Sequence, residues 1–184
     1  GAAVWYAMRP TPPRVVQLTA ATTPATALMV NGPDRALAIT PDGSRIVYVG
    51  NNGSELLVRS LDALEPVSLY RTDRQLRGPF VSPDGQWVGF VDNFNTLKKV
   101  AITGGPAMTV TPLDGAWAGA VWMPDDTIVF AAGPSGLQQT AAGGGAVKVL
   151  TRPEPARGEA AHVYPELLPG GRAVIFTIGA TGGA

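Results

Sequence analysis

Short apolar runs alternate with turn residues along most of the chain, and one such unit recurs at a nearly constant step. The unit is an apolar run, a Pro-Asp-Gly turn and a second run rich in β-branched and aromatic residues. Its copies lie 42, 41 and 45 residues apart, with marker prolines at Pro41, Pro83, Pro124 and Pro169. A fixed period near forty residues indicates one supersecondary unit that repeats in space.

The Pro-Asp-Gly segments predict tight turns between pairs of strands. Proline presets φ, aspartate can bond its own backbone two residues on, and glycine accepts positive φ. The run after the first turn, Arg45–Val49, is too uniformly apolar for a one-sided sheet and suits a strand covered on both faces. The fourth copy keeps the turn with Gly170 in place of aspartate. We therefore interpret Asp42, Asp84 and Asp125 as turn residues and not as ligands.

The second half of each unit predicts a second strand pair. Two more short apolar runs follow each turn, and the stretch between them contains Gly-Gly in two of the copies, which is a hairpin signal. Four antiparallel strands in about forty residues describe a β-propeller blade. The sequence thus predicts an all-β fold, a β-propeller with about three and a half four-stranded blades at residues 35–72, 77–112, 117–151 and 162–178.

Three and a half blades form an open arc, whereas propellers typically close a ring of four to eight. Open arcs leave strand edges exposed, and exposed edges pair with other chains. We expect further blades in the natural protein, because the sequence stops within a repeat. The alternative is a homo-oligomer in which two copies complete a ring. Lys98-Lys99 is expected at an outer or edge position, where lysine discourages aggregation.

The second copy carries the fullest form of the repeat. It reads Ser82-Pro83-Asp84-Gly85, then Trp87-Val88-Gly89-Phe90, then Gly104-Gly105. This pattern resembles the WD40-like repeat of TolB-type bacterial propellers, and the resemblance covers roughly residues 36–178. It implies a propeller that binds partners or occurs beside another domain, such as a peptidase.

Three further segments point to a more specific relative. Residues Arg77–Trp87, Asn95–Val100 and Pro165–Arg172 are similar to the propeller tails of bacterial membrane-bound serine/threonine protein kinases. In that family an intracellular kinase domain precedes one membrane helix, and the propeller lies outside. The resemblance implies a periplasmic or extracytoplasmic sensor or docking module, with a cytoplasmic location left open. It implies no kinase activity here, because the sequence lacks the glycine-rich loop, His-Arg-Asp and Asp-Phe-Gly motifs.

Composition removes several function classes. The 184 residues include 14 basic and 14 acidic side chains, and zero net charge argues against a nucleic-acid partner. The absence of cysteine excludes disulfides and thiolate metal sites. We expect no cofactor and no metal, because one histidine with scattered carboxylates does not make a transition-metal site. No loop has the Asp-x-Asp-x-Asp-Gly spacing of a calcium site.

Residues 1–14 are expected to form an apolar and then proline-rich linker. Its apolar part is too short for a bilayer, which needs about twenty residues. Two interpretations stay open: the outer end of a membrane helix with Trp5 and Tyr6 at the interface, which would tether the protein, or a frayed terminus or cloning scar. Val15–Thr19 is predicted to be an outer strand that closes the ring on the last blade.

The candidate binding residues are predicted from their offset to the marker prolines. The only histidine, His162, lies seven residues before Pro169, and Trp117 holds the equivalent position in the previous copy. The first strand of a blade lines the central channel, so residues just before it sit at the channel mouth, where loops carry function. A binding surface of Arg77, Trp117, Glu159 and His162 follows, with Trp117 as its exposed aromatic. The alternative, which we favour for His162, is packing against a neighbouring blade.

Two main classes of function remain. The first is a non-catalytic sensor or scaffold that binds a protein or small-molecule ligand of unknown identity. The second is a propeller hydrolase or lyase with its site in the channel, or the accessory propeller of a peptidase. A channel enzyme should place His162, Glu159 and one more titratable group within hydrogen-bond reach. A third interpretation is a spacer between other domains.

Overall fold

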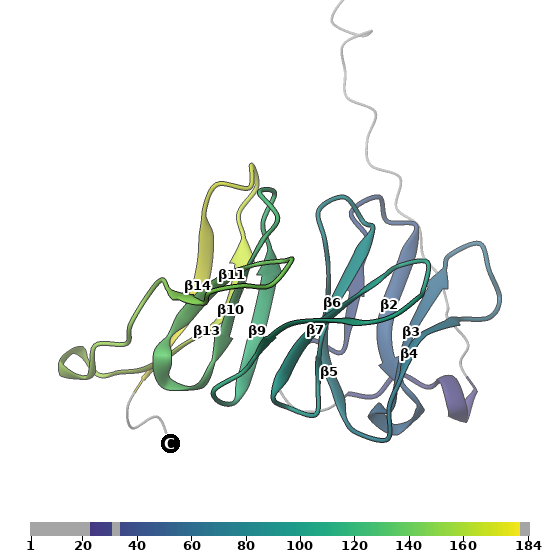
Figure 1. The fold of residues 1–184 in the computed structure, drawn as a ribbon, viewed down its shortest axis with the longest axis horizontal. Helices are drawn as coiled ribbons and strands as arrows, with labels where there is room; N and C mark the ends of the chain where they lie inside the picture. The colour runs from purple at the N-terminus through teal and green to yellow at the C-terminus, as the bar shows by residue number, and fades with distance from the viewer. Residues whose placement is uncertain (1–22, 31–33, 181–184) are drawn as a thin grey trace, which may run out of the picture.

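The fold is a row of antiparallel sheets that stand side by side in chain order (Figure 1). The computed structural model describes residues 23–30 and 34–180 of the chain. Three sheets have four strands and the last has two, and in each sheet the strand order follows the chain. The predicted all-β propeller of about three and a half blades is thereby confirmed. The expected linker at residues 1–14 and the expected strand Val15–Thr19 lie outside the described residues.

Among the described residues, the four blades contain fourteen strands in chain order. Blade 1 contains β1 (Leu37–Ile39), β2 (Arg45–Gly50), β3 (Glu55–Ser60) and β4 (Val67–Arg71). Blade 2 contains β5 (Leu76–Val81), β6 (Trp87–Asp92), β7 (Thr96–Ala101) and β8 (Met108–Pro112). Blade 3 contains β9 (Trp117–Trp122), β10 (Thr127–Ala132), β11 (Leu137–Ala141) and β12 (Lys148–Val149). Blade 4 contains β13 (Glu159–Leu167) and β14 (Val174–Ala180). Short 3-10 turns lie at Pro24–Thr26, Asn51–Gly53, Gly133–Ser135 and Pro155–Arg157.

The first strand of each blade lies on the inner side of the row. β1, β5, β9 and β13 stand at the edge of their own sheets and contact one another in that order. Each of these strands pairs with only one neighbour among the described residues, so one backbone edge of each inner strand is left unpaired. The inner strands therefore form a continuous surface to which all four blades contribute.

The repeated turns are held by their own side chains. The Asp42 carboxylate accepts hydrogen bonds from the Thr40 hydroxyl and from the backbone and hydroxyl of Ser44. These bonds favour the charged form, and they lower the pKa of Asp42 to about 2. Asp84 and Asp125 are bonded in the same way, and their pKa values are also lowered by hydrogen bonds within the turn. The aspartates recur because the turn recurs.

Apolar side chains of neighbouring sheets pack against one another between the blades. One cluster joins blades 1 and 2 and includes Val47, Val49, Val88 and Phe90. A second joins blades 2 and 3, and a third brings Phe176 of β14 against blade 3. Because the sheets of blades 2 and 3 are covered on both faces, their central strands read as continuous apolar runs in the sequence.

The expectation for Lys98-Lys99 is wrong. Both lysines lie on β7, the third strand of a four-stranded sheet, which is bonded on both sides. Lys98 Nζ donates hydrogen bonds to Asp92 Oδ2 at 2.6 Å and to Tyr70 Oη at 3.0 Å, so it joins blade 2 to blade 1. Lys99 Nζ lies 4.6 Å from the centre of the Trp87 ring. A long apolar stem lets a lysine charge reach such partners from within a sheet.

Candidate functional site

A repeated irregularity in the inner strands shapes the inner surface. β5, β9 and β13 each carry a register shift against their partner strand, and a residue with positive φ lies within it. That residue is Gly78 (56°), Gly119 (98°) or Tyr164 (53°), five residues before the marker proline in each copy. Such bulges re-aim side chains and are common beside functional sites. Sequence reasoning missed this feature, although glycine at a fixed offset in two copies was a signal for it.

Trp117 is buried, so the expectation of an exposed aromatic at this position is wrong. Its side chain is 6% exposed and stacks on Phe80 with ring centres 6.3 Å apart. The indole occupies the space that Gly78 leaves, since a Cβ on Gly78 would lie 2.3 Å from Trp117 Nε1. The exposed aromatic on this surface is instead Tyr164, which is 37% exposed.

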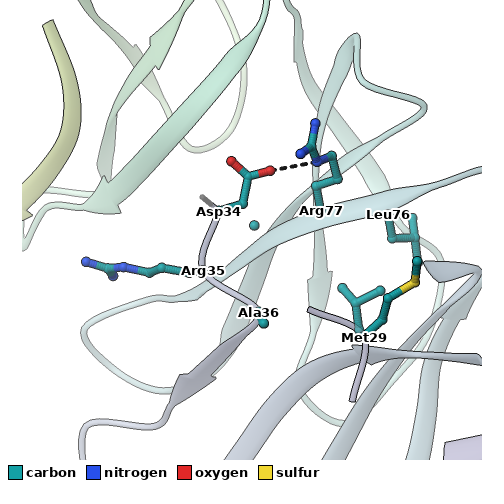
Figure 2. Close-up of a pocket in the computed structure, with 8 residues that line it drawn as sticks. Met29, Asp34, Arg35, Ala36, Leu76 and Arg77 are labelled. Atoms are coloured by element: carbon teal, nitrogen blue, oxygen red, sulfur yellow. Dashed lines mark ion pairs between the residues drawn. The ribbon is translucent and has the colours of Figure 1, made fainter. Parts of the chain in front are cut away.

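Arg77 is held by a carboxylate from the preceding blade. Its Nε lies 2.6 Å from Oδ2 of Asp34, whose side chain is only 6% exposed (Figure 2). The contact is a charge pair without hydrogen-bond alignment. Burial raises the pKa of the Asp34 carboxyl, and the charge of Arg77 acts in the opposite direction. Figure 2 shows Arg35 extending away from this pair.

A second ion pair connects the first blade to the last. Arg35 precedes β1 and Glu166 lies on β13, and their side chains meet in a salt bridge. About half of each side chain is exposed. Burial of its remaining part lowers the pKa of the Arg35 guanidinium. This bridge spans the inner side of the arc, between residues far apart in the sequence.

His162 and Glu159 form a separate group. His162 is buried, with Nδ1 2.8 Å from Thr151 Oγ1 and Nε2 3.1 Å from Glu159 Oε2. Thr151 follows β12, so the contact joins blade 4 to blade 3, which is the packing interpretation of this histidine. A hydrogen bond from the Glu154 amide, together with His162, lowers the pKa of Glu159. Of the four predicted residues, His162 and Glu159 are in direct contact, whereas Arg77 pairs with Asp34 and Trp117 packs on Phe80.

An open hollow of about 630 Å³ lies along the inner strands. It is lined by side chains from all four blades, and Arg35 is the one charged residue among those described at its wall. Leu37 and Ile39 of β1 are 40% and 57% exposed there. The remaining wall is Ala38, Pro41, Phe80, Val81, Pro83, Ala120, Val121, Trp122 and Leu167.

Residues 23–30 and 34–180 lack two features. In this part of the chain, no group of three or more His, Cys, Asp or Glu side chains is placed to hold a metal ion. The same residues include no helix that is both long and apolar enough to cross a membrane.

Comparison with known proteins gives matches among solved structures. No family model matches the sequence, and no curated protein does. TolB from Acinetobacter baumannii superposes with a TM-score of 0.66 at 21% identity, over 82% of this chain and 39% of that one. Oligogalacturonate lyase from Vibrio parahaemolyticus gives 0.62 at 19%, over 80% and 47%, and a nidogen–laminin complex gives 0.58 at 16%, over 77% and 54%.

The chain has a TolB-like propeller fold. Identities this low show the fold alone, so what these proteins bind or cleave does not carry over. The chain spans about half or less of the length of the structures it matches. Association with a kinase stays a prediction from the sequence.

Proposed function

We propose that this chain is a non-catalytic binding module whose inner hollow receives part of a partner. The observation that carries the proposal is the hollow of about 630 Å³, with exposed Leu37 and Ile39 at its wall. Its volume falls within the roughly 300 to 1,000 Å³ typical of ligand sites. Apolar surface that stays exposed on a folded domain marks interaction sites.

The backbone of the inner strands adds a second argument. β1, β5, β9 and β13 each present an unpaired edge, and such edges bind extended segments through main-chain hydrogen bonds. An apolar wall beside unpaired backbone edges suits an extended peptide segment of a protein partner. Side-chain pockets along the hollow would then supply specificity.

The alternative of a channel hydrolase or lyase receives less support. A catalytic site in the channel requires a third titratable group within hydrogen-bond reach of His162 and Glu159. The partners of the His162 ring nitrogens are Thr151 and Glu159, and Thr151 does not titrate in the range of acid–base catalysis. This arrangement favours a binding role over a catalytic one.

The proposal includes a setting outside the inner membrane, as the propeller tail of a receptor-like serine/threonine kinase. Its support is the sequence resemblance of Arg77–Trp87 and Pro165–Arg172, which the fold places on the two inner strands β5 and β13 and the turns that follow them. The coding sequence before Gly1 tests this setting. An in-frame kinase domain and membrane helix are expected there, and an unrelated domain would refute the association.

The binding role is tested with peptides selected from a phage-displayed random library on the purified chain. Ile39→Asp places a charge in the hollow, and Leu64→Asp is its control, because Leu64 is 85% exposed and does not line the hollow. Calorimetry should show peptide affinity lost in Ile39→Asp and kept in Leu64→Asp. If no peptide is enriched, or both variants bind like the parent chain, the hollow is not the binding site.

A further inference from the structure

A small cavity adjoins the hollow at the bulges of the inner strands. It shares Arg35, Phe80 and Ala120 with the wall of the hollow, and Trp117 and Tyr164 complete its boundary with Asp34, Gly78, Pro79, Gly119 and Pro165. The space open to the centre of a water-sized sphere is about 20 Å³. One water needs roughly 10 to 15 Å³ by this measure, so the cavity admits a single small polar end group.

Two buried polar atoms at the cavity have no hydrogen-bond partner among the described residues. They are Trp117 Nε1, which can only donate, and Asp34 Oδ2, which lies 2.6 Å from Arg77 Nε without hydrogen-bond alignment and, when ionised, still has a lone pair for a donor. Both side chains are 6% exposed. Buried polar groups in folded proteins nearly always find a partner, and those that do not call for an explanation such as a ligand.

Charge at the cavity selects the kind of group that fits. Arg35 is already paired with Glu166, and Asp34 is already paired with Arg77. An incoming carboxylate would face the Asp34 charge, and an incoming ammonium would leave the Trp117 N–H without an acceptor. A neutral group that both accepts and donates satisfies Trp117 and Asp34 together, and a primary amide does so from one planar unit.

Backbone strain at the cavity supports a role beyond packing. Tyr164 has φ of 53°, at the position where the two preceding blades have glycine. A left-handed conformation is unfavourable for a residue with a Cβ, and such outliers cluster at ligand sites. Tyr164 is 37% exposed and, with the half-exposed Arg35, forms the part of the cavity wall that an entering group would pass.

We infer that this cavity is a subsite for an uncharged amide, such as an asparagine or glutamine side chain of the bound segment. Its carbonyl oxygen accepts from Trp117 Nε1, and its N–H donates to Asp34. The inference rests on the proposed binding function, since the cavity opens at the wall of the same hollow. The inference adds an amide group to the apolar side chains that the hollow would recognise.

The test uses propionamide as the probe and the indole N–H resonances as the readout. In ¹⁵N-labelled protein, propionamide should shift the Trp117 Nε1–H signal saturably, and propionate at equal concentration should not. Trp122 Nε1 is the internal control, because it already donates to Asp126 Oδ1 at 2.9 Å and should not move. Propionamide tests the cavity alone. The subsite can therefore be refuted while selected peptides still bind the hollow, so the two proposals are distinguished.

Trp117→Phe removes the donor while keeping an aromatic ring. Propionamide affinity, followed at the Gly119 amide, should fall about tenfold, as expected when one hydrogen bond to a buried donor is lost. Folding is checked by the unchanged spectrum of blade 1. Equal shifts with propionamide and propionate, no saturable shift, or a long-lived water at Trp117 that propionamide does not displace would each overturn the subsite.

Discussion

Gly89→Ala is the substitution for which the structure gives the most direct prediction. Gly89 lies on β6 opposite Phe80 of β5, and the Phe80 ring covers it. A Cβ at Gly89 would lie 2.2 Å from the ring carbon Cζ, far inside van der Waals contact. The ring cannot swing away freely, because it is 4% exposed and held between Trp117 and Trp122, with ring centres 6.3 and 6.0 Å away.

The expected loss of stability follows from two opposing effects. Overpacking a filled core costs about 1 to 3 kcal/mol. Alanine also restricts the unfolded chain, which returns about 0.4 to 1 kcal/mol. Gly89→Ala should therefore lower the free energy of unfolding by about 1 to 2 kcal/mol. Urea denaturation should show a lower midpoint with an unchanged slope.

Gly179→Ala is the matched control, because Gly179 also lies in a strand and the nearest atom to its Cβ would be at 3.5 Å. This control should be neutral or slightly stabilising. In a Phe80→Leu background, Gly89→Ala should become nearly harmless, since the obstructing ring is gone, and the double-mutant cycle would show this coupling. Equal stability of Gly89→Ala and Gly179→Ala would refute the reasoning.

Three further predictions concern side-chain contacts. His162→Ala should lower the free energy of unfolding by about 2 kcal/mol or more, because two hydrogen bonds and the packing of the ring are lost. Calorimetry should show unchanged peptide binding, and lost binding in a fully folded variant would show that His162 belongs to the binding site. Lys98→Met should lower the free energy of unfolding, measured by urea denaturation, by about 2 to 3 kcal/mol, because it leaves the buried Asp92 carboxylate without its cation. A Lys98→Met/Asp92→Leu double variant should recover most of that loss. Asp42 has a folded pKa of about 2, below its ordinary value of 3.8, so the unfolded chain takes up protons first as pH falls. Its stabilising effect should be complete above about pH 4 and decline toward about pH 2, and Asp42→Asn should flatten that decline in urea midpoints measured across the range.

The blades were predictable because the signals that define them are local. The turns at Asp42 and Asp84 bond within a few residues of themselves, so the sequence shows them without any tertiary information. Apolar periodicity and Gly-Gly stretches located the remaining strands, and the constant step revealed their repetition. His162 and Glu159 are in contact because they are three residues apart on one strand, which the sequence shows directly.

The lysine and tryptophan expectations failed where a neighbouring blade decided the outcome. Lys98 reaches Tyr70 of blade 1, and Trp117 is buried because Gly78 of blade 2 leaves room for its indole. Neither contact has a sequence pattern, since the two partners in each case belong to different repeats. The bulge glycines could have been noticed from their offset, but the strained Tyr164 breaks that pattern and is evident only in the structure.

The repeat, the strand content, the turns and the all-β propeller class follow from the amino-acid sequence, since short-range backbone and turn chemistry produce them. Which side chains share the inner surface depends on how the blades pack against one another. The Arg35–Glu166 bridge and the Asp34–Arg77 pair arise where the inner strands of different blades meet. So does the burial of Trp117 Nε1, which has no hydrogen-bond partner in the described part of the chain. Packing sheets side by side brings distant residues together, and that long-range geometry creates the hollow and the small cavity beside it.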